Sequence, residues 1–283
     1  MIRGRTSLAI AVRRPDNNIE VTSRPLAALY KGNWRNLFLI RGIIALIETV
    51  ALGTSALMYS AQVAGETEEE KITPGMLWGS VVLGVLIAVV LFFILPLLLV
   101  RVFDSLIASA FISNILEGIV RIIFFVTYLA AIGRMKDIRE IFACHGAEHM
   151  AVNALESGLP LTIDNVKRNS TAHVRCGTSF LLVVLLVAIV VFALLGRPPL
   201  WIGIVSRVLL IPVIAAVSYE IIKFEANYAD NLIVRWLMAP GLWLQAMTTR
   251  RPSEGQIEVA IAALSRAIEA DGLTPAVSGY TAN

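Results

Sequence analysis

The sequence is poor in charged residues and in the side chains that usually carry chemistry. Only 16% of its 283 residues are Asp, Glu, Lys or Arg, whereas soluble globular domains carry about 25%. Two cysteines cannot build a disulfide framework. The net charge of +3 is too small an excess to indicate nucleic-acid binding. These shortages exclude a disordered chain and a disulfide scaffold, and they argue against a water-soluble enzyme.

Long apolar runs take the place of the missing charge. Hydrophobic residues make up 57% of the chain, and its mean hydropathy is +0.74. A membrane-spanning helix needs about 20 mostly apolar residues. Runs of this kind predict four transmembrane helices, over residues 76–100, 115–132, 178–195 and 202–222. We therefore expect an all-α integral membrane protein with a four-span domain over residues 76–222, placed in a lipid bilayer.

Residues 37–58 form a fifth apolar run that contains Arg41, Glu48 and two glycines. A charge near the centre of a spanning helix costs about 2.5–3.5 kcal/mol on insertion scales. We therefore expect residues 37–75 to form an interfacial or re-entrant helix followed by a charged loop. A fifth span is the alternative.

The two ends of the chain are more polar. Residues 7–12 and 19–23 are rich in β-branched and apolar residues and flank Pro-Asp-Asn-Asn, which predicts a small β-hairpin within a β-rich segment over residues 1–36. Residues 223–283 contain aromatic residues beside a helix breaker and an apolar pattern of helical spacing, which indicates interfacial and amphipathic helices.

Lysine and arginine are distributed unevenly along the chain. Nine lie in residues 1–75, six in 134–176 and five in 223–283, but only one lies in each loop after the first and third spans. Cytoplasmic loops of membrane proteins are enriched in these residues. The distribution predicts a multi-pass protein of a bacterial inner membrane, with both termini and the 134–176 loop in the cytoplasm.

All three histidines and both cysteines lie between positions 144 and 176. We expect a helix over residues 136–156, on which His145 and His149 are one turn apart and share a face. Together with Glu148 they form the H-x-x-E-H spacing of zinc proteases of the reversed type. Two such imidazoles can hold a divalent metal, most simply Zn²⁺, while the carboxylate of Glu148 accepts the proton of a water molecule.

Spacing offers several candidates for the remaining ligands. A third ligand can come from His173 or from Glu220, and Cys176 follows His173 by three residues. Four ligands, with His173 and Cys176 both included, would form a closed structural site, whereas three would leave a position open for catalysis. A third interpretation is that the histidines pack on or against their helix and bind no metal. Haem ligation is disfavoured, because two histidines on one helix cannot occupy opposite axial positions.

Charges inside the apolar runs have simpler interpretations. Glu117 and Arg121 are four residues apart and are expected to pair on one helix. We expect Arg207 to extend its side chain to the membrane interface or to meet Glu117, and Glu48 to pair with Arg41 or with a neighbouring helix.

The motif around His145 is part of a longer resemblance. The stretches 145–149, 160–166, 173–180, 207–213, 240–245 and 248–261 are similar to the YqhQ-like family of bacterial multi-pass membrane proteins. That family is a domain of unknown function, described as predicted metal-dependent enzymes, so the resemblance implies a membrane fold and a metal site. Its members carry an aromatic residue where this chain has Cys144 and a lysine where it has Met150. They also begin with a Gly-Gly-Gln-type segment, and we expect this chain to start near the end of that segment, without its true beginning.

Two functions follow as hypotheses. In the first, the protein is a zinc hydrolase of peptidase type that acts on a peptide or lipid-linked substrate at the cytoplasmic membrane face, with Glu148 as the base and Arg175 stabilising an oxyanion. In the second, the metal only stabilises the loop, and the protein is an accessory or scaffold in membrane-protein biogenesis or in a transport complex. The substrate and the partner are not identified by the sequence.

Overall fold

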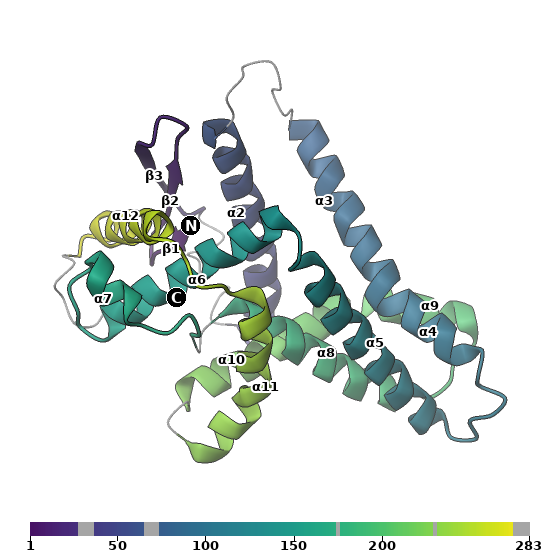
Figure 1. The fold of residues 1–283 in the computed structure, drawn as a ribbon. Helices are drawn as coiled ribbons and strands as arrows, with labels where there is room; N and C mark the ends of the chain where they lie inside the picture. Colours follow the sequence, from purple (N-terminus) through teal and green to yellow (C-terminus); the bar gives the residue numbers. More distant parts are fainter. Residues whose placement is uncertain (28–36, 65–73, 174–175, 229–230, 274–283) are drawn as a thin grey trace.

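The computed structural model in Figure 1 describes residues 1–27, 37–64, 74–173, 176–228 and 231–273. A small antiparallel sheet lies at the N-terminus, with strand order β1 (Ile2–Arg3), β2 (Ser7–Arg13) and β3 (Ile19–Pro25). The predicted hairpin is β2–β3, in which Ser7 lies opposite Pro25 and Arg13 lies opposite Ile19. The short strand β1 adds a third member at the free edge of β2.

Strand β2 is buried on both faces, which is why it reads as a nearly continuous apolar run. Ala9 and Ala11 face a core built by helices α6 (Lys136–Glu156), α7 (Ile163–Lys167) and α12 (Glu254–Ala270). Leu8 and Ile10 face the other way and pack against helix α2 (Ile40–Ala64). We call the sheet with α6, α7 and α12 the body of the protein.

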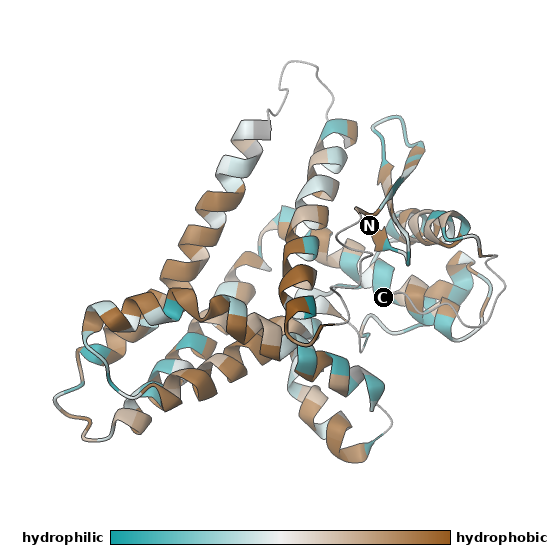
Figure 2. Ribbon diagram, turned by 180° about the vertical axis from the view of Figure 1, so that it is seen from behind, coloured by the Kyte–Doolittle hydropathy of each residue, from teal (hydrophilic) through white to brown (hydrophobic). Residues whose placement is uncertain are grey.

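The remaining helices form an apolar region beside the body, as the hydropathy colours of Figure 2 show. They are α3 (Pro74–Val89), the π-helical turn η2 (Val90–Ile94), α4 (Leu95–Arg101), α5 (Ala110–Ile132), α8 (Gly177–Leu194), α9 (Leu200–Leu209), α10 (Ile211–Asn227) and α11 (Leu232–Thr248). Helices long and apolar enough to cross a membrane cover residues 40–63, 78–101, 110–132 and 177–194. By length and composition this is a multi-pass membrane protein.

Two segments differ from the simplest reading of the sequence. Helix α2 is continuous and has the length and composition of a span, although Leu52, Ala56 and Tyr59 on its second half pack against the sheet. Its interfacial or re-entrant placement therefore stays a prediction. The predicted span over 202–222 consists of two helices, α9 and α10, that meet at an angle of 46°.

Helices α5 and α8 pack against each other and connect two polar regions. Three residues separate the end of α5 from the start of α6, and α8 begins at Gly177, directly after Cys176. The other ends of both helices, near residues 110 and 194, meet α4 and α9 (Figure 1). One polar region is therefore at the body, and the other is at the far end of the same two helices.

Candidate metal site between α6 and α8

Helix α6 presents two different faces. Ala147, Met150, Ala151 and Ala154 enter the apolar core of the body. His145 and His149 lie on the opposite side of the helix, as their spacing of four residues predicts, and their ring centroids are 4.3 Å apart. His149 is buried, whereas His145 is half-buried. The body therefore fixes both imidazoles by burying the other side of their helix.

Cys176 completes a group of three side chains that could hold a metal ion. Its Sγ atom lies 3.3 Å from Nε2 of His145. One ligating atom from each of His145, His149 and Cys176 lies within 4.8 Å of the other two. Zinc bonds of about 2.3 Å to sulfur and 2.0 Å to nitrogen place tetrahedral ligands about 3.5 Å apart. The contact between Cys176 and His145 matches this spacing, and the three side chains together could hold a metal ion.

Backbone carbonyl groups orient both imidazoles. Nδ1 of His145 lies 3.1 Å from the carbonyl oxygen of Thr248, and Nδ1 of His149 lies 2.6 Å from that of Thr171. A carbonyl oxygen only accepts hydrogen bonds, so in each ring Nδ1 carries the proton and donates it. Nε2 of a neutral ring then keeps its lone pair for a metal. Histidine ligands in metal sites typically have this second contact.

The thiol of Cys176 lies where ionisation is favoured. Cys176 caps the N-terminus of α8, and its Sγ accepts a hydrogen bond from the Thr178 amide at 3.4 Å. Burial opposes ionisation, but hydrogen bonds and charge from His145 and His149 outweigh it and lower the pKa of Cys176 to about 5. Cys144 differs, because desolvation and the carboxylate of Glu140 raise the pKa of its thiol. Cys176, and not Cys144, is therefore the cysteine that could contribute a thiolate to a metal site.

His145 responds to the same charge. Burial lowers the pKa of its ring, but the hydrogen bond and negative charge of Cys176 outweigh burial and raise that pKa. Without an ion, the cluster is therefore a thiolate beside an imidazole that binds a proton more tightly than usual. A divalent cation can take the place of that proton.

Two residues outside the cluster determine where its parts lie. A side chain at Gly146 would begin only 2.2 Å from the carbonyl oxygen of Arg250, so only glycine lets this segment approach α6 closely. Gln245 is fully buried; it accepts a hydrogen bond from the amide of His173 at 3.0 Å and donates to the His173 carbonyl at 2.8 Å and to Ser179 at 3.0 Å. Sequence reasoning assigned no role to Gln245, and its only local signal is an amide within an apolar helix.

The other predicted site residues have different partners. Nε2 of His173 lies 3.2 Å from a carboxylate oxygen of Glu156, and its ring centroid is 5.8 Å from that of His149. Glu220 forms an ion pair with Arg41 of α2. Glu148, beside His149, lies 3.9 Å from the Met1 amine and is partly exposed. Arg175 lies outside the residues that the structure describes.

The comparisons with known proteins identify a family but give no activity. Residues 37–270 match a family described as "Protein of unknown function (DUF1385)". The chain is 32% identical over 288 residues to "Uncharacterized protein YqhQ" of Bacillus subtilis (strain 168), an alignment that covers 97% of this chain and 91% of that protein. No solved structure matches. The chain therefore belongs to the DUF1385 family.

Proposed function

We propose that this protein is a zinc-dependent membrane hydrolase, with the ion held by His145, His149 and Cys176 where the body meets the membrane helices. The observation that carries the proposal is the convergence of three ligating atoms within 4.8 Å. Both imidazole rings are also oriented by backbone carbonyls, so their Nε2 atoms are available. The ligand set combines imidazole with thiolate, which zinc prefers.

The number of ligands favours catalysis over a purely structural role. Catalytic zinc sites typically have three protein ligands and one open position, whereas structural sites have four. A zinc ion in such a site supplies the positive charge that activates a water molecule for hydrolysis. Glu148 neighbours His149 on α6 and is accessible to solvent, which suits a group that accepts a proton. The apolar helix α8 begins directly at Cys176, so peptide or lipid-linked substrates at the membrane face fit the location.

A structural role is the second candidate, and one observation favours it. The three ligands come from two different regions, α6 of the body and the N-terminus of α8. An ion bound there would join these regions permanently, as an accessory or scaffold protein requires. His173, whose ring centroid is 5.8 Å from that of His149, is a residue that could close such a site as a fourth ligand.

Zinc analysis of the purified protein tests the centre. We expect about one zinc ion per chain in the wild type and in Cys144→Ser, and a loss of at least tenfold in zinc affinity in Cys176→Ser. Cys144 is the matched control because it is the other cysteine of the same segment. Equal zinc content in the two variants, or no zinc in the wild type, would contradict the proposal.

X-ray absorption and one further variant separate the two roles. A hydrolase requires three protein ligands with a light atom in the fourth position, whereas a scaffold permits four protein ligands. Glu148→Gln should keep its zinc and lose turnover on a panel of peptide and lipid-linked ester substrates, because the amide cannot accept the proton. If X-ray absorption finds four protein ligands, the hydrolase proposal fails and the structural role takes its place.

A further inference from the structure

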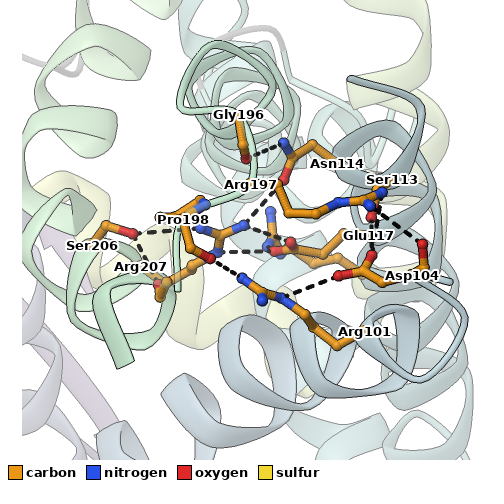
Figure 3. Close-up of polar contacts among 12 residues, drawn as sticks. Arg101, Asp104, Ser113, Asn114, Glu117, Gly196, Arg197, Pro198, Ser206 and Arg207 are labelled. Carbon is orange, nitrogen blue, oxygen red and sulfur yellow. Dashed lines mark hydrogen bonds and ion pairs between the residues drawn. The ribbon is translucent and has the colours of Figure 1, made fainter. Parts of the chain in front are cut away.

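A second polar region lies toward the far end of α5 and α8, and Figure 3 shows how its charged side chains converge. It contains four arginines but only two carboxylates: Arg101, Arg121, Arg197 and Arg207 with Asp104 and Glu117. We call these six residues the arginine cluster. At neutral pH its positive charges outnumber its negative charges by two. Such an excess is unfavourable beside hydrocarbon unless an anion balances it.

Glu117 is shared by the two most deeply buried arginines. Its carboxylate lies 2.5 Å from Nη2 of Arg121 and 2.6 Å from Nη2 of Arg207, and the arginine side chains are only 1% exposed. Arg207 also donates to the side-chain oxygen of Asn114 at 3.2 Å. One carboxylate therefore faces two guanidinium groups, and this inner part of the cluster keeps a net positive charge.

Arg101 and Arg197 form the outer part of the cluster, where about a quarter of each side chain is exposed. Both lie near Asp104, at 3.5 and 3.4 Å. Nε of Arg197 is buried and has no hydrogen-bond partner among the described residues, and the same holds for Nη1 of Arg121. The outer arginines share a single carboxylate and also donate to backbone carbonyls, Arg197 to those of Asp104, Ile107 and Ser109 and Arg101 to that of Pro198. Among the described residues, Nε of Arg197 is the buried donor of this outer part that has no partner.

The cluster encloses a small cavity of about 10 Å³, lined by Arg101, Asn114, Arg197 and Arg207 among others. This is room for about one water-sized atom. A single oxygen of a larger anion fits inside, but the body of that anion must remain at the mouth. The outer arginines, Arg101 and Arg197, are the groups that can contact it there.

An apolar groove begins next to this cavity. It has a volume of about 440 Å³ and is lined only by hydrophobic side chains of the α4 and α5 regions: Leu99, Val100, Phe103, Ile107, Leu116, Val120, Ile123 and Phe124. Val100 lines both the groove and the cavity. From there the groove follows α5 toward the middle of that helix. A cationic pocket therefore continues into a hydrocarbon-lined groove.

We propose that the arginine cluster and this groove bind one anionic phospholipid. A phosphate oxygen of the headgroup enters the cavity, where guanidinium groups donate charge-assisted hydrogen bonds. An acyl chain lies in the groove between α4 and α5. The lipid supplies the negative charge that the cluster lacks, and it occupies the membrane end opposite the histidines.

Lipid titration of the full-length protein, followed by native mass spectrometry, tests this site. The probes are phosphatidylglycerol, which is anionic, phosphatidylcholine, which is zwitterionic, and inorganic phosphate. We expect the wild type to bind phosphatidylglycerol about tenfold more tightly than phosphatidylcholine. Arg101→Gln should remove most of this preference, because the lost contact is charge-assisted. Arg134→Gln is the matched control, since Arg134 lies just beyond the other end of α5 and donates to the Ala130 carbonyl, away from the arginine cluster.

A second variant separates lipid from free phosphate and does not remove a charge. Leu116 is exposed on the groove wall, so Leu116→Trp fills the groove and leaves the arginines in place. It should weaken phosphatidylglycerol binding and leave the binding of inorganic phosphate unchanged. The proposal is overturned by equal binding of the two lipids, by equal losses in Arg101→Gln and Arg134→Gln, or by a Leu116→Trp variant that binds the anionic lipid normally. The lipid proposal is also overturned if a second protein, and not a lipid, is found bound in the groove.

Discussion

Helices α5 and α8 have buried polar chemistry at both ends, and the two ends are built for opposite charges. At the body, two imidazoles and a thiolate direct electron pairs toward one point. At the far end, guanidinium groups outnumber carboxylates by two to one. The first arrangement suits a cation and the second suits an anion. The same helix pair therefore separates two kinds of binding chemistry by the length of a membrane helix.

The two ends are also held in place differently. The cation end is positioned mainly by neutral contacts: backbone carbonyls orient the histidines, and Gln245 holds the chain before Cys176. The anion end is held by ion pairs that share Glu117. We therefore expect charge removal to damage the anion end most, and changes of shape to damage the cation end most.

The largest effect is expected from Glu117→Gln. This substitution leaves Arg121 and Arg207 buried without their shared negative charge, and breaking a buried pair typically costs about 3–5 kcal/mol. Guanidinium- or heat-induced unfolding in detergent measures the loss. Glu269→Gln is the control, because Glu269 pairs with Arg266 on the exposed surface of α12, where such pairs contribute less than about 1 kcal/mol. Similar losses in the two variants would show that the buried cluster is not held by Glu117.

A smaller effect is expected from Gly146→Ala, at about 1–3 kcal/mol. The added carbon would lie 2.2 Å from the Arg250 carbonyl, and this backbone is tied to α6 by a hydrogen bond from the Arg250 amide to Phe142. The segment must move, and the Thr248 carbonyl moves with it, away from Nδ1 of His145. Zinc affinity should therefore fall together with the free energy of unfolding.

Gly118→Ala is the corresponding change at the other end of the helix pair. Its new carbon would lie 2.3 Å from the side chain of Ile189 on α8, which can change rotamer. We expect a smaller loss of stability and no change in zinc affinity. A reduction in zinc affinity equal to that in Gly146→Ala would indicate general loosening of the protein in place of a local shift at the site.

The spacing of residues along single helices predicted several contacts at both ends of the α5–α8 pair. Four residues separate His145 from His149 and Glu117 from Arg121, and on a helix this spacing places each pair on one face. The meeting of Arg207 with Glu117 was one of two expected outcomes and is confirmed at 2.6 Å. The β2–β3 hairpin followed from its turn residues and its β-rich flanks.

Contacts between distant segments could not be predicted in the same way. Spacing assigned the third ligand to His173 or Glu220 and included Cys176 only in a closed four-ligand site, whereas the structure groups Cys176 with the two histidines. Glu48 was expected to pair with Arg41 or with a neighbouring helix; it forms an ion pair with Arg3 of the sheet, and Arg41 pairs with Glu220. These choices depend on how the sheet packs on α2, which no local pattern encodes.

The smallest predicted effect concerns Asp271, which attaches the sheet to α12. Its carboxylate accepts hydrogen bonds from the Arg5 amide at 2.5 Å, the Thr6 amide at 2.9 Å and the Thr6 hydroxyl at 2.7 Å. Burial raises the pKa of Asp271, but these bonds outweigh burial and lower that pKa below its ordinary value of 3.8. The folded state therefore favours the charged carboxylate, so this stabilisation is present above about pH 4 and is lost as the pH falls through the folded pKa.

Asp271→Asn should accordingly lower the free energy of unfolding by about 1 kcal/mol at pH 7 and by less at pH 3. The two unfolding curves should converge as the pH falls, because the wild-type carboxyl is then protonated and loses its advantage over the amide. Zinc content at pH 7 should not change, since these hydrogen bonds hold the N-terminal segment and not the three residues of the metal site. A difference between the variants that stays constant from pH 7 to pH 3 would mean that the shape of the side chain, and not its charge, attaches the sheet to the body.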